Sequence, residues 1–255
     1  MTVQHWLHRV WRSGVNRVSH ITGRLHPQWS PDVAWRYLPI ARIVRAVVGE
    51  RGSVLDVGAG GRGIGAYLPN RCVLTDYIRP VGPGPRFVLA DAALLPFSDL
   101  SFDAVVQADV MEHVPPEKRP VVARELFRVA RRLVVVAAPA GAAAEAHDRR
   151  LAAAAHPSNH LRHFLQEHFD YGLPTREELL RLVLEGAQGS FVQPRVRVER
   201  NANLFLRYLV MRSLVRVEDE DVAARIRVWT PFSRVLASIR MGECYRLIVS
   251  CENGC

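Results

Sequence analysis

The stretch that most constrains this fold is a short apolar segment that runs straight into a cluster of glycines. Residues 54–57 read Val-Leu-Asp-Val, and residues 58–63 read Gly-Ala-Gly-Gly-Arg-Gly. A buried parallel strand that feeds a tight loop and then a helix has this pattern. The glycines allow a sharp turn, and they let the backbone approach a ligand where a Cβ atom would obstruct it. The stretch therefore predicts a nucleotide-type binding loop at the carboxyl end of a strand.

Asp56 distinguishes between two kinds of ligand for this loop. A dinucleotide would place its pyrophosphate against the loop and the helix N-terminus behind it, where a carboxylate would repel the phosphates. A cofactor with an ammonium and a sulfonium group, and no phosphate, would instead be attracted. The loop, with Asp56, Gly58 and Gly60 as expected contacts, therefore favours S-adenosylmethionine over NAD.

Two further predicted strands also end in an acid. Residues 72–76 end at Asp76, whose carboxylate can accept hydrogen bonds from both ribose hydroxyls, and Tyr77 beside it can cover the adenosine. The next strand leads to Asp91 and Ala92, where the carboxylate can accept from the adenine amino group and a backbone N–H can donate to a ring nitrogen. Each acid could instead cap a helix or a turn. Acids at three strand ends favour the ligand site.

Together these motifs resemble the class I S-adenosylmethionine-dependent methyltransferases, in particular the branch of ubiquinone/menaquinone C-methyltransferases and many small-molecule and sugar methyltransferases. The resemblance covers residues 50–140 and implies S-adenosylmethionine as the cofactor. We expect Gln107 to contact it as well. Arg62 stands where the family often has glycine, and it is expected to reach the methionyl carboxylate. The matching residues are Asp56-Val57-Gly58-Ala59-Gly60, Asp76, Asp91-Ala92, Leu95-Pro96-Phe97, Ser101-Phe102-Asp103 and Glu112-His113.

The order of predicted elements indicates an α/β fold. Strands that alternate with helices predict a Rossmann-like, doubly wound sheet that is mostly parallel. The resemblance implies seven strands, the last of them antiparallel. Residues 1–48 would form an N-terminal helical extension or flap, and residues 49–255 the methyltransferase domain, with helical insertions at about 139–174 and 203–240. The expected strands are 53–57, 72–76, 86–90, 103–107, 133–138, 191–199 and 244–250.

Local signals predict three helices. Residues 30–32, Ser-Pro-Asp, combine an N-cap, a proline at the first position and an acid in the first turn. We expect Pro39 to kink the helix that follows or to split it into two. A second helix is expected at 117–131. Residues 175–178 form a capping box that opens a third helix through Val183.

Histidines after the fourth and fifth strands are the candidate bases. Methyl transfer from a sulfonium is an in-line displacement, and a hydroxyl acceptor must also lose a proton. His113 is one candidate, and support of the cofactor loop is its alternative role. His156, His160 and His163 would share one helix face, and we expect the base among them because their insertion can close over the acceptor. No metal ion is expected, because these histidines lack a carboxylate partner at a fixed spacing.

Composition and charge bear on partners and location. The formal net charge is +9, but the arginines are spread along the whole chain, which indicates a solvated basic surface rather than a nucleic-acid-binding face. The four cysteines lack metal-type spacing, so we expect reduced thiols and a cytoplasmic protein. Residues 1–24 interleave tryptophans with cations. They predict a flap over the cofactor, an arm of a homodimer, or a peripheral helix at the inner face of the membrane.

The resemblance and the available bases imply methyl transfer to a small-molecule acceptor, a hydroxyl of a sugar or of a secondary metabolite. A C-methyltransferase of a quinone-like or lipid ring is the first alternative. An RNA methyltransferase would need a basic groove that leads to the sulfonium. A non-catalytic cofactor-binding module is the third alternative, because no residue is unambiguously catalytic.

Overall fold

The computed structural model describes residues 30–60, 63–68, 72–79, 86–159 and 161–254. Their strands form one seven-stranded sheet in the order β3-β2-β1-β4-β5-β7-β6. Strands β1 to β5 are parallel, whereas β7 runs antiparallel to both β5 and β6. The predicted Rossmann-like sheet with an antiparallel last strand is therefore confirmed. The strands are β1 (Val54–Val57), β2 (Cys72–Asp76), β3 (Phe87–Leu89), β4 (Phe102–Ala108), β5 (Ala130–Pro139), β6 (Pro194–Asn203) and β7 (Cys244–Asn253).

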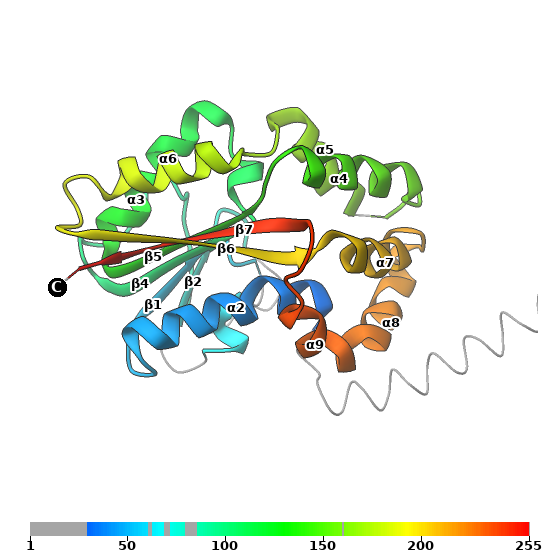
Figure 1. Cartoon of the computed structure of the whole chain (residues 1–255), viewed down its shortest axis with the longest axis horizontal. Coiled ribbons are helices and arrows are strands. Elements are labelled where there is room, and N and C mark those ends of the chain that lie inside the picture. Colours follow the sequence, from blue (N-terminus) through cyan, green and yellow to red (C-terminus); the bar gives the residue numbers. More distant parts are fainter. Residues whose placement is uncertain (1–29, 61–62, 69–71, 80–85, 160, 255) are drawn as a thin grey trace, which may run out of the picture.

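Helices cover both faces of the sheet. Helix α2 (Pro31–Val48) lies along one face, and α3 (Arg119–Val129) and α6 (Arg176–Ala187) lie along the other (Figure 1). Strand β5 shows how one apolar run supplies both layers, since Leu133 packs into the α2 side and Val134 into the α3–α6 side. Alternating side chains point to opposite faces of a strand, so a parallel strand between two helical layers is apolar throughout.

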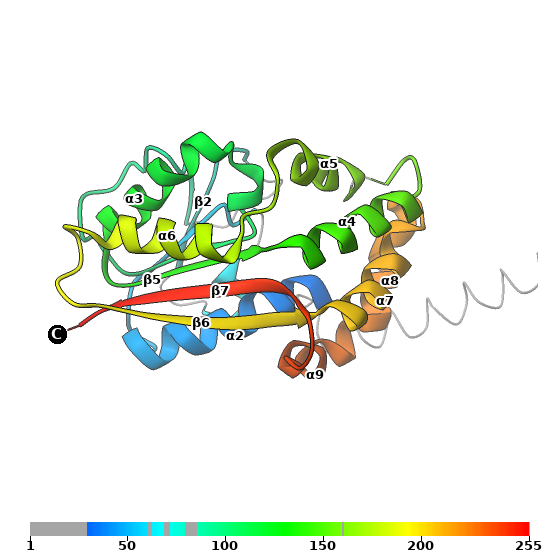
Figure 2. The same ribbon diagram turned by 45° about the horizontal axis from the view of Figure 1, so that its top comes forward.

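A second group of helices lies beyond the carboxyl ends of the parallel strands (Figures 1 and 2). Helices α4 (Ala142–Ala154) and α5 (Leu161–Tyr171) occupy the segment predicted as the first insertion. The second predicted insertion holds α7 (Leu204–Val215), α8 (Asp219–Trp229) and α9 (Ser233–Ser238). Side chains of α4, α5 and α7 share a small apolar core of their own. None of the helices in the described ranges is long and apolar enough to cross a membrane.

Pro39 does not split α2, which excludes one of the two expected outcomes, a kink or a division into two helices. The helix runs without a break from Pro31 to Val48 with Pro39 inside it. Proline cannot donate to the carbonyl four residues earlier, which here belongs to Trp35. The side-chain amide of Asn201 on β6 donates to that carbonyl at 2.7 Å. A distant donor therefore replaces the hydrogen bond that proline removes.

Three other helix predictions differ in detail from the structure. Helix α3 ends at Val129 because β5 begins at Ala130. The Thr175 hydroxyl caps α6 by accepting from the Glu178 N–H, but the Glu178 carboxylate accepts from Arg119 instead of closing the capping box. After β1 the chain forms only a single 3-10 turn, because a proline at position 69 follows closely. The 3-10 turns are η1 (Ile64–Ala66), η2 (Met111–His113), η3 (Pro116–Lys118) and η4 (Thr230–Phe232).

Candidate active site

Backbone hydrogen bonds and close packing hold the glycine loop after β1 in place. The backbone N–H groups of Gly58 and Ala59 both donate to the Thr75 carbonyl at 2.9 Å. Gly58 has a φ of 73°, and a Cβ atom there would lie 2.3 Å from a methyl group of Val110. Only glycine satisfies both constraints without strain. Gly60 also has a positive φ, of 59°, with open space beside its Cα atom. At Gly58 and Gly60 the loop therefore presents its backbone to the cavity with no side chain in between.

Asp56 supports this loop from beneath and does not line the cavity above it. Its side chain is fully buried, and Oδ2 accepts a hydrogen bond of 2.6 Å from the Ile64 N–H. A Cβ atom on Gly63 would lie 2.5 Å from the same oxygen, so the carboxylate fills the space under the turn. Burial raises the pKa of Asp56 to about 7, and the Ile64 hydrogen bond opposes that shift. The expected direct contact with the cofactor is replaced by a role in shaping the loop.

Asp76 at the end of β2 stands beside the loop. Its Oδ2 atom accepts from the Gly60 N–H at 2.9 Å, and Oδ1 accepts from the Ile78 N–H at 3.1 Å. Gly58, Gly60, Asp76 and Tyr77 all line a cavity of about 460 Å³. A carboxylate has about four acceptor sites, so these two bonds leave lone pairs for ribose hydroxyls. This wall of the cavity fits an adenosine-bearing cofactor.

Asp109 and Arg36 form a second wall of the cavity, and the Asp109 carboxylate pairs with both Arg36 and Arg246. It follows β4 with a φ of 55°, an uncommon conformation that clusters at functional sites. Arg246 on β7 makes a bidentate ion pair with it, with Nε 2.5 Å from Oδ1, and Arg36 on α2 lies 3.0 Å from Oδ2. Although burial raises the pKa of Asp109, these arginines lower it well below its ordinary value. Because β7 is antiparallel, its first residues reach the same sheet edge as the ends of β1 and β4.

Glu112, His113 and His168 form a cluster at the third side of the cavity. Glu112 and His113 lie on η2, directly after β4, and His168 comes from α5. One ligating atom of each residue lies within 4.8 Å of the others, and all three residues line the cavity. Burial raises the pKa of Glu112 well above its ordinary value, and the charge of Asp109 raises it further. Burial and the neighbouring His168 lower the pKa of His113.

Carboxylates hold both imidazoles of this cluster. His113 Nδ1 lies 2.6 Å from Glu167 Oε2, and His168 Nδ1 lies 2.8 Å from Asp148 Oδ2. Asp148 is fully buried and also accepts from the Tyr245 hydroxyl at 2.8 Å. Although burial raises the pKa of Asp148, hydrogen bonds from His147 and His168 and the charge of Arg207 lower it. The Asp148 carboxylate is therefore ionised, and it fixes the orientation of the His168 ring.

Apolar side chains complete the cavity. They come from α4, α5 and α7, the helices of the two predicted insertions, and they lie next to the histidine cluster. One cavity is thus lined by the glycine loop with Asp76, by Asp109 with its arginine, by the histidine cluster and by these apolar side chains, which form its apolar wall. It lies at the carboxyl edge of the sheet, the usual place for ligands in such folds. The apolar residues are Leu151, Leu161, Phe164, Leu165, Met211 and Val215.

The structure brings part of the predicted site together. Gly58, Gly60, Asp76, Tyr77 and His113 line the cavity. The lining does not include Asp56, Asp91, Ala92, Gln107 or His156. The carboxylate of Asp91 instead accepts from the Ala93 N–H at 2.8 Å, and Gln107 is buried within β4. Arg62 and His160 lie outside the described residues, as do residues 1–24.

The predicted shared helix face of His156, His160 and His163 is wrong. His156 lies in a turn between α4 and α5, and α5 begins only at Leu161. Proline at position 157 disfavours helix before it, and the Asn159 side chain accepts from the Leu161 N–H at 3.1 Å, so the chain turns here. His156 is partly exposed, and its Nδ1 atom lies 2.9 Å from the Ser158 hydroxyl. The side chain of His163 lies outside the part of the chain described.

Comparison with known proteins identifies the domain. Residues 55–137 match the family model described as a methyltransferase domain. The chain therefore carries a methyltransferase domain. It is an enzyme, its cofactor is S-adenosylmethionine, and its fold is that of the class I methyltransferases. The cavity fits this cofactor, since Asp76 offers acceptors beside a loop whose Gly60 leaves open space.

Solved structures share the fold at low sequence identity. A protein of Anabaena variabilis described as a methyltransferase from an antibiotic biosynthesis pathway is 14% identical, with a TM-score of 0.52, over 85% of this chain and 98% of that one. The methyltransferase domain of bacterial CtHen1-C is 12% identical, with a TM-score of 0.50, over 87% and 98%. The 1,6-didemethyltoxoflavin-N1-methyltransferase of Burkholderia thailandensis is 16% identical, with a TM-score of 0.49, over 100% and 92%. No curated protein matches the chain.

Proposed function

We propose that this methyltransferase transfers a methyl group to a hydroxyl of a small secondary metabolite with an apolar body. The observation that carries the proposal is the juxtaposition of six apolar side chains with His113 and His168 in one cavity. An acceptor would bury its apolar part against α4, α5 and α7 and present a polar atom to the histidine cluster. Within the expected class of acceptors, these apolar side chains favour an aromatic or aliphatic metabolite over a sugar.

The residues supply position and proton transfer. S-adenosylmethionine supplies an activated methyl group, whose bond to sulfur breaks as the acceptor oxygen attacks, with the electron pair left on sulfur. Asp76 and the glycine loop hold the adenosine end, and the helices of the insertions exclude water from the acceptor. His113, whose pKa burial lowers, is largely neutral at neutral pH, so the hydroxyl proton can leave into the cluster that it forms with Glu112 and His168.

An acceptor screen tests this proposal. We expect S-adenosylhomocysteine release with hydroxylated aromatic or aliphatic compounds, and product NMR should show a methyl group on oxygen. Phe164→Ala removes a half-exposed side chain of the apolar wall and should raise the KM for the acceptor with cofactor affinity unchanged. Phe205→Ala, at an exposed phenylalanine outside the cavity lining, is the matched control.

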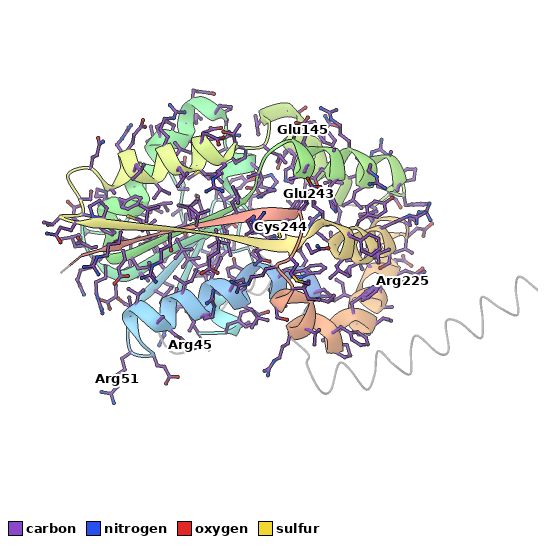
Figure 3. All side chains as sticks on the ribbon, viewed as in Figure 1. Arg45, Arg51, Glu145, Arg225, Glu243 and Cys244 are labelled. Atoms are coloured by element: carbon purple, nitrogen blue, oxygen red, sulfur yellow. The ribbon has the colours of Figure 1, made fainter. Side chains whose placement is uncertain are left out.

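Other products would replace this proposal with one of its alternatives. A methyl group on a ring carbon would favour the C-methyltransferase of a quinone-like or lipid ring, which the apolar wall also fits. Transfer to RNA alone would contradict a small-molecule acceptor. Arg45 and Arg51 lie toward one end of the molecule and Arg225 toward the other (Figure 3), so these three cations are not clustered together. The cytoplasmic location, the homodimer and the membrane contact of residues 1–24 stay predictions.

A further inference from the structure

Two imidazoles and one carboxylate converge in the cavity without a role in binding the adenosine end of the cofactor. One ligating atom each from Glu112, His113 and His168 lies within 4.8 Å of the other two. Three ligands of one tetrahedral ion at bond lengths of about 2.1 Å lie about 3.4 Å from one another. Binding of one ion would therefore draw the most widely spaced pair of atoms together by at most about 1.4 Å.

The partners of the two histidines select their tautomers. A carboxylate oxygen only accepts, so His113 Nδ1 donates its hydrogen to Glu167 at 2.6 Å, and His168 Nδ1 donates to Asp148 at 2.8 Å. Each neutral ring then keeps its lone pair on Nε2. Histidines that bind metal ions almost always donate their other N–H to a carboxylate, a carbonyl or a water, which fixes the ring and raises its basicity. Here both rings have a carboxylate in that position.

Glu112 is the third member of the cluster. Its side chain is 1% exposed, and its Oε2 atom has no hydrogen-bond partner among the described residues. A buried carboxylate oxygen without a partner is uncommon and calls for an unseen water, proton or ion. Glu112 also lines the cavity, so this oxygen belongs to a group that a ligand can reach.

We propose that Glu112, His113 and His168 bind a divalent first-row transition-metal ion such as Zn²⁺ or Co²⁺. Imidazole nitrogens suit these ions and disfavour Mg²⁺ and Ca²⁺, which prefer oxygen ligands. Three protein ligands leave coordination positions open, as in catalytic rather than structural sites. The proposal revises the sequence-based expectation of no metal, which concerned His156, His160 and His163.

The open positions suggest what the ion would do, and this step rests on the proposed function. With the cluster occupied by the ion, an acceptor hydroxyl bound to the ion would have a lower pKa and would lose its proton to solvent or to a cavity carboxylate, in place of the cluster, as its oxygen attacks the methyl carbon. The apolar wall lies in the same cavity, so the acceptor body and its metal-bound oxygen can be held together. The acceptor class that fits is an apolar molecule with a hydroxyl next to a second oxygen, which can chelate the ion.

Calorimetry with the metal alone tests the site on the full chain. After treatment with a chelator, titration with Zn²⁺ and with Co²⁺ should show one ion bound per chain, and Co²⁺ should give a visible spectrum typical of nitrogen and oxygen ligands. Glu112→Gln and His168→Ala should weaken binding a hundredfold or more. Glu167→Gln, which changes only the partner of His113, should weaken it about tenfold to a hundredfold. His156→Ala, at a partly exposed histidine outside the cavity lining, is the matched control and should bind as the wild type does.

Binding of S-adenosylhomocysteine keeps this test separate from the proposed function. Variants that still bind the product are folded, so a loss of metal affinity in them reports on the ligands. The proposal is overturned if neither Zn²⁺ nor Co²⁺ binds stoichiometrically, if Glu112→Gln and His168→Ala bind as tightly as the wild type, or if the Co²⁺ spectrum shows thiolate ligands. Stoichiometric binding of Mg²⁺ alone would likewise contradict it. Each of these outcomes concerns metal binding alone. The proposed methyl transfer is tested separately, by the acceptor screen without added metal.

Discussion

Replacing Asp56 by asparagine is expected to change how the free energy of unfolding depends on pH. Burial raises the pKa of this carboxyl from 3.8 to about 7 in the folded protein. Between these two values the folded chain holds a proton that the unfolded chain releases, so stability falls as pH rises from about 4 to about 7. A shift of this size corresponds to about 4 kcal/mol, since each pKa unit is worth 1.36 kcal/mol.

Asp56→Asn removes this titration and keeps an acceptor for the Ile64 N–H, which bonds to the carboxylate at 2.6 Å. Urea unfolding at several pH values between 4.5 and 8 should show the variant gaining stability relative to the wild type as pH rises. The difference between the two proteins isolates Asp56 from other groups that titrate in the same range. We expect a relative gain of a few kcal/mol across this range. Parallel stability curves for the two proteins would refute the reasoning, because Asp56 would then titrate alike in the folded and unfolded states.

Two further predictions concern the cofactor wall and α2. Asp76→Ala should lower the calorimetric affinity for S-adenosylhomocysteine about tenfold or more, because one charged hydrogen bond is worth about 1.5–3 kcal/mol. An unchanged affinity in a folded variant would show that Asp76 only accepts from the Gly60 and Ile78 N–H groups and does not bind the cofactor. Asn201→Leu leaves the buried Trp35 carbonyl without its donor and should cost about 1–3 kcal/mol of unfolding free energy. The cost should shrink in a Pro39→Ala background, where the residue 39 N–H can replace that donor; equal costs in both backgrounds would contradict the compensation.

The sheet was predictable because its signals are local. Buried parallel strands are short apolar runs, and Val54–Val57 and Cys72–Asp76 lie within a residue of their predicted bounds. The continuity of α2 was not predictable, since the donor that offsets Pro39 is Asn201, on β6. An apolar pattern around a proline carries no information about a partner so far along the chain.

The same contrast between local signals and distant partners explains which residues of the candidate site could be predicted. Gly58, Asp76 and His113 lie at or shortly after the ends of parallel strands, so their place at the carboxyl edge follows from topology. Several other charged and polar residues of the cavity come from separate elements, among them Arg36 from α2, His168 from α5 and Tyr245 from β7. The adjacent Glu112-His113 pair was a visible signal, but its pairing with His168 depends on the packing of α5 against η2. Asp56 was placed in the correct loop, and only its burial under the turn required the structure.

Calorimetric titration of the full chain with S-adenosylhomocysteine and, separately, with NAD tests the central claim most directly. The claim is that the cavity formed by the glycine loop and Asp76 holds an adenosine cofactor without phosphate groups. We expect saturable binding of one S-adenosylhomocysteine per chain, a melting temperature that rises with its concentration, and no binding of NAD. Binding of NAD without binding of S-adenosylhomocysteine would contradict the account.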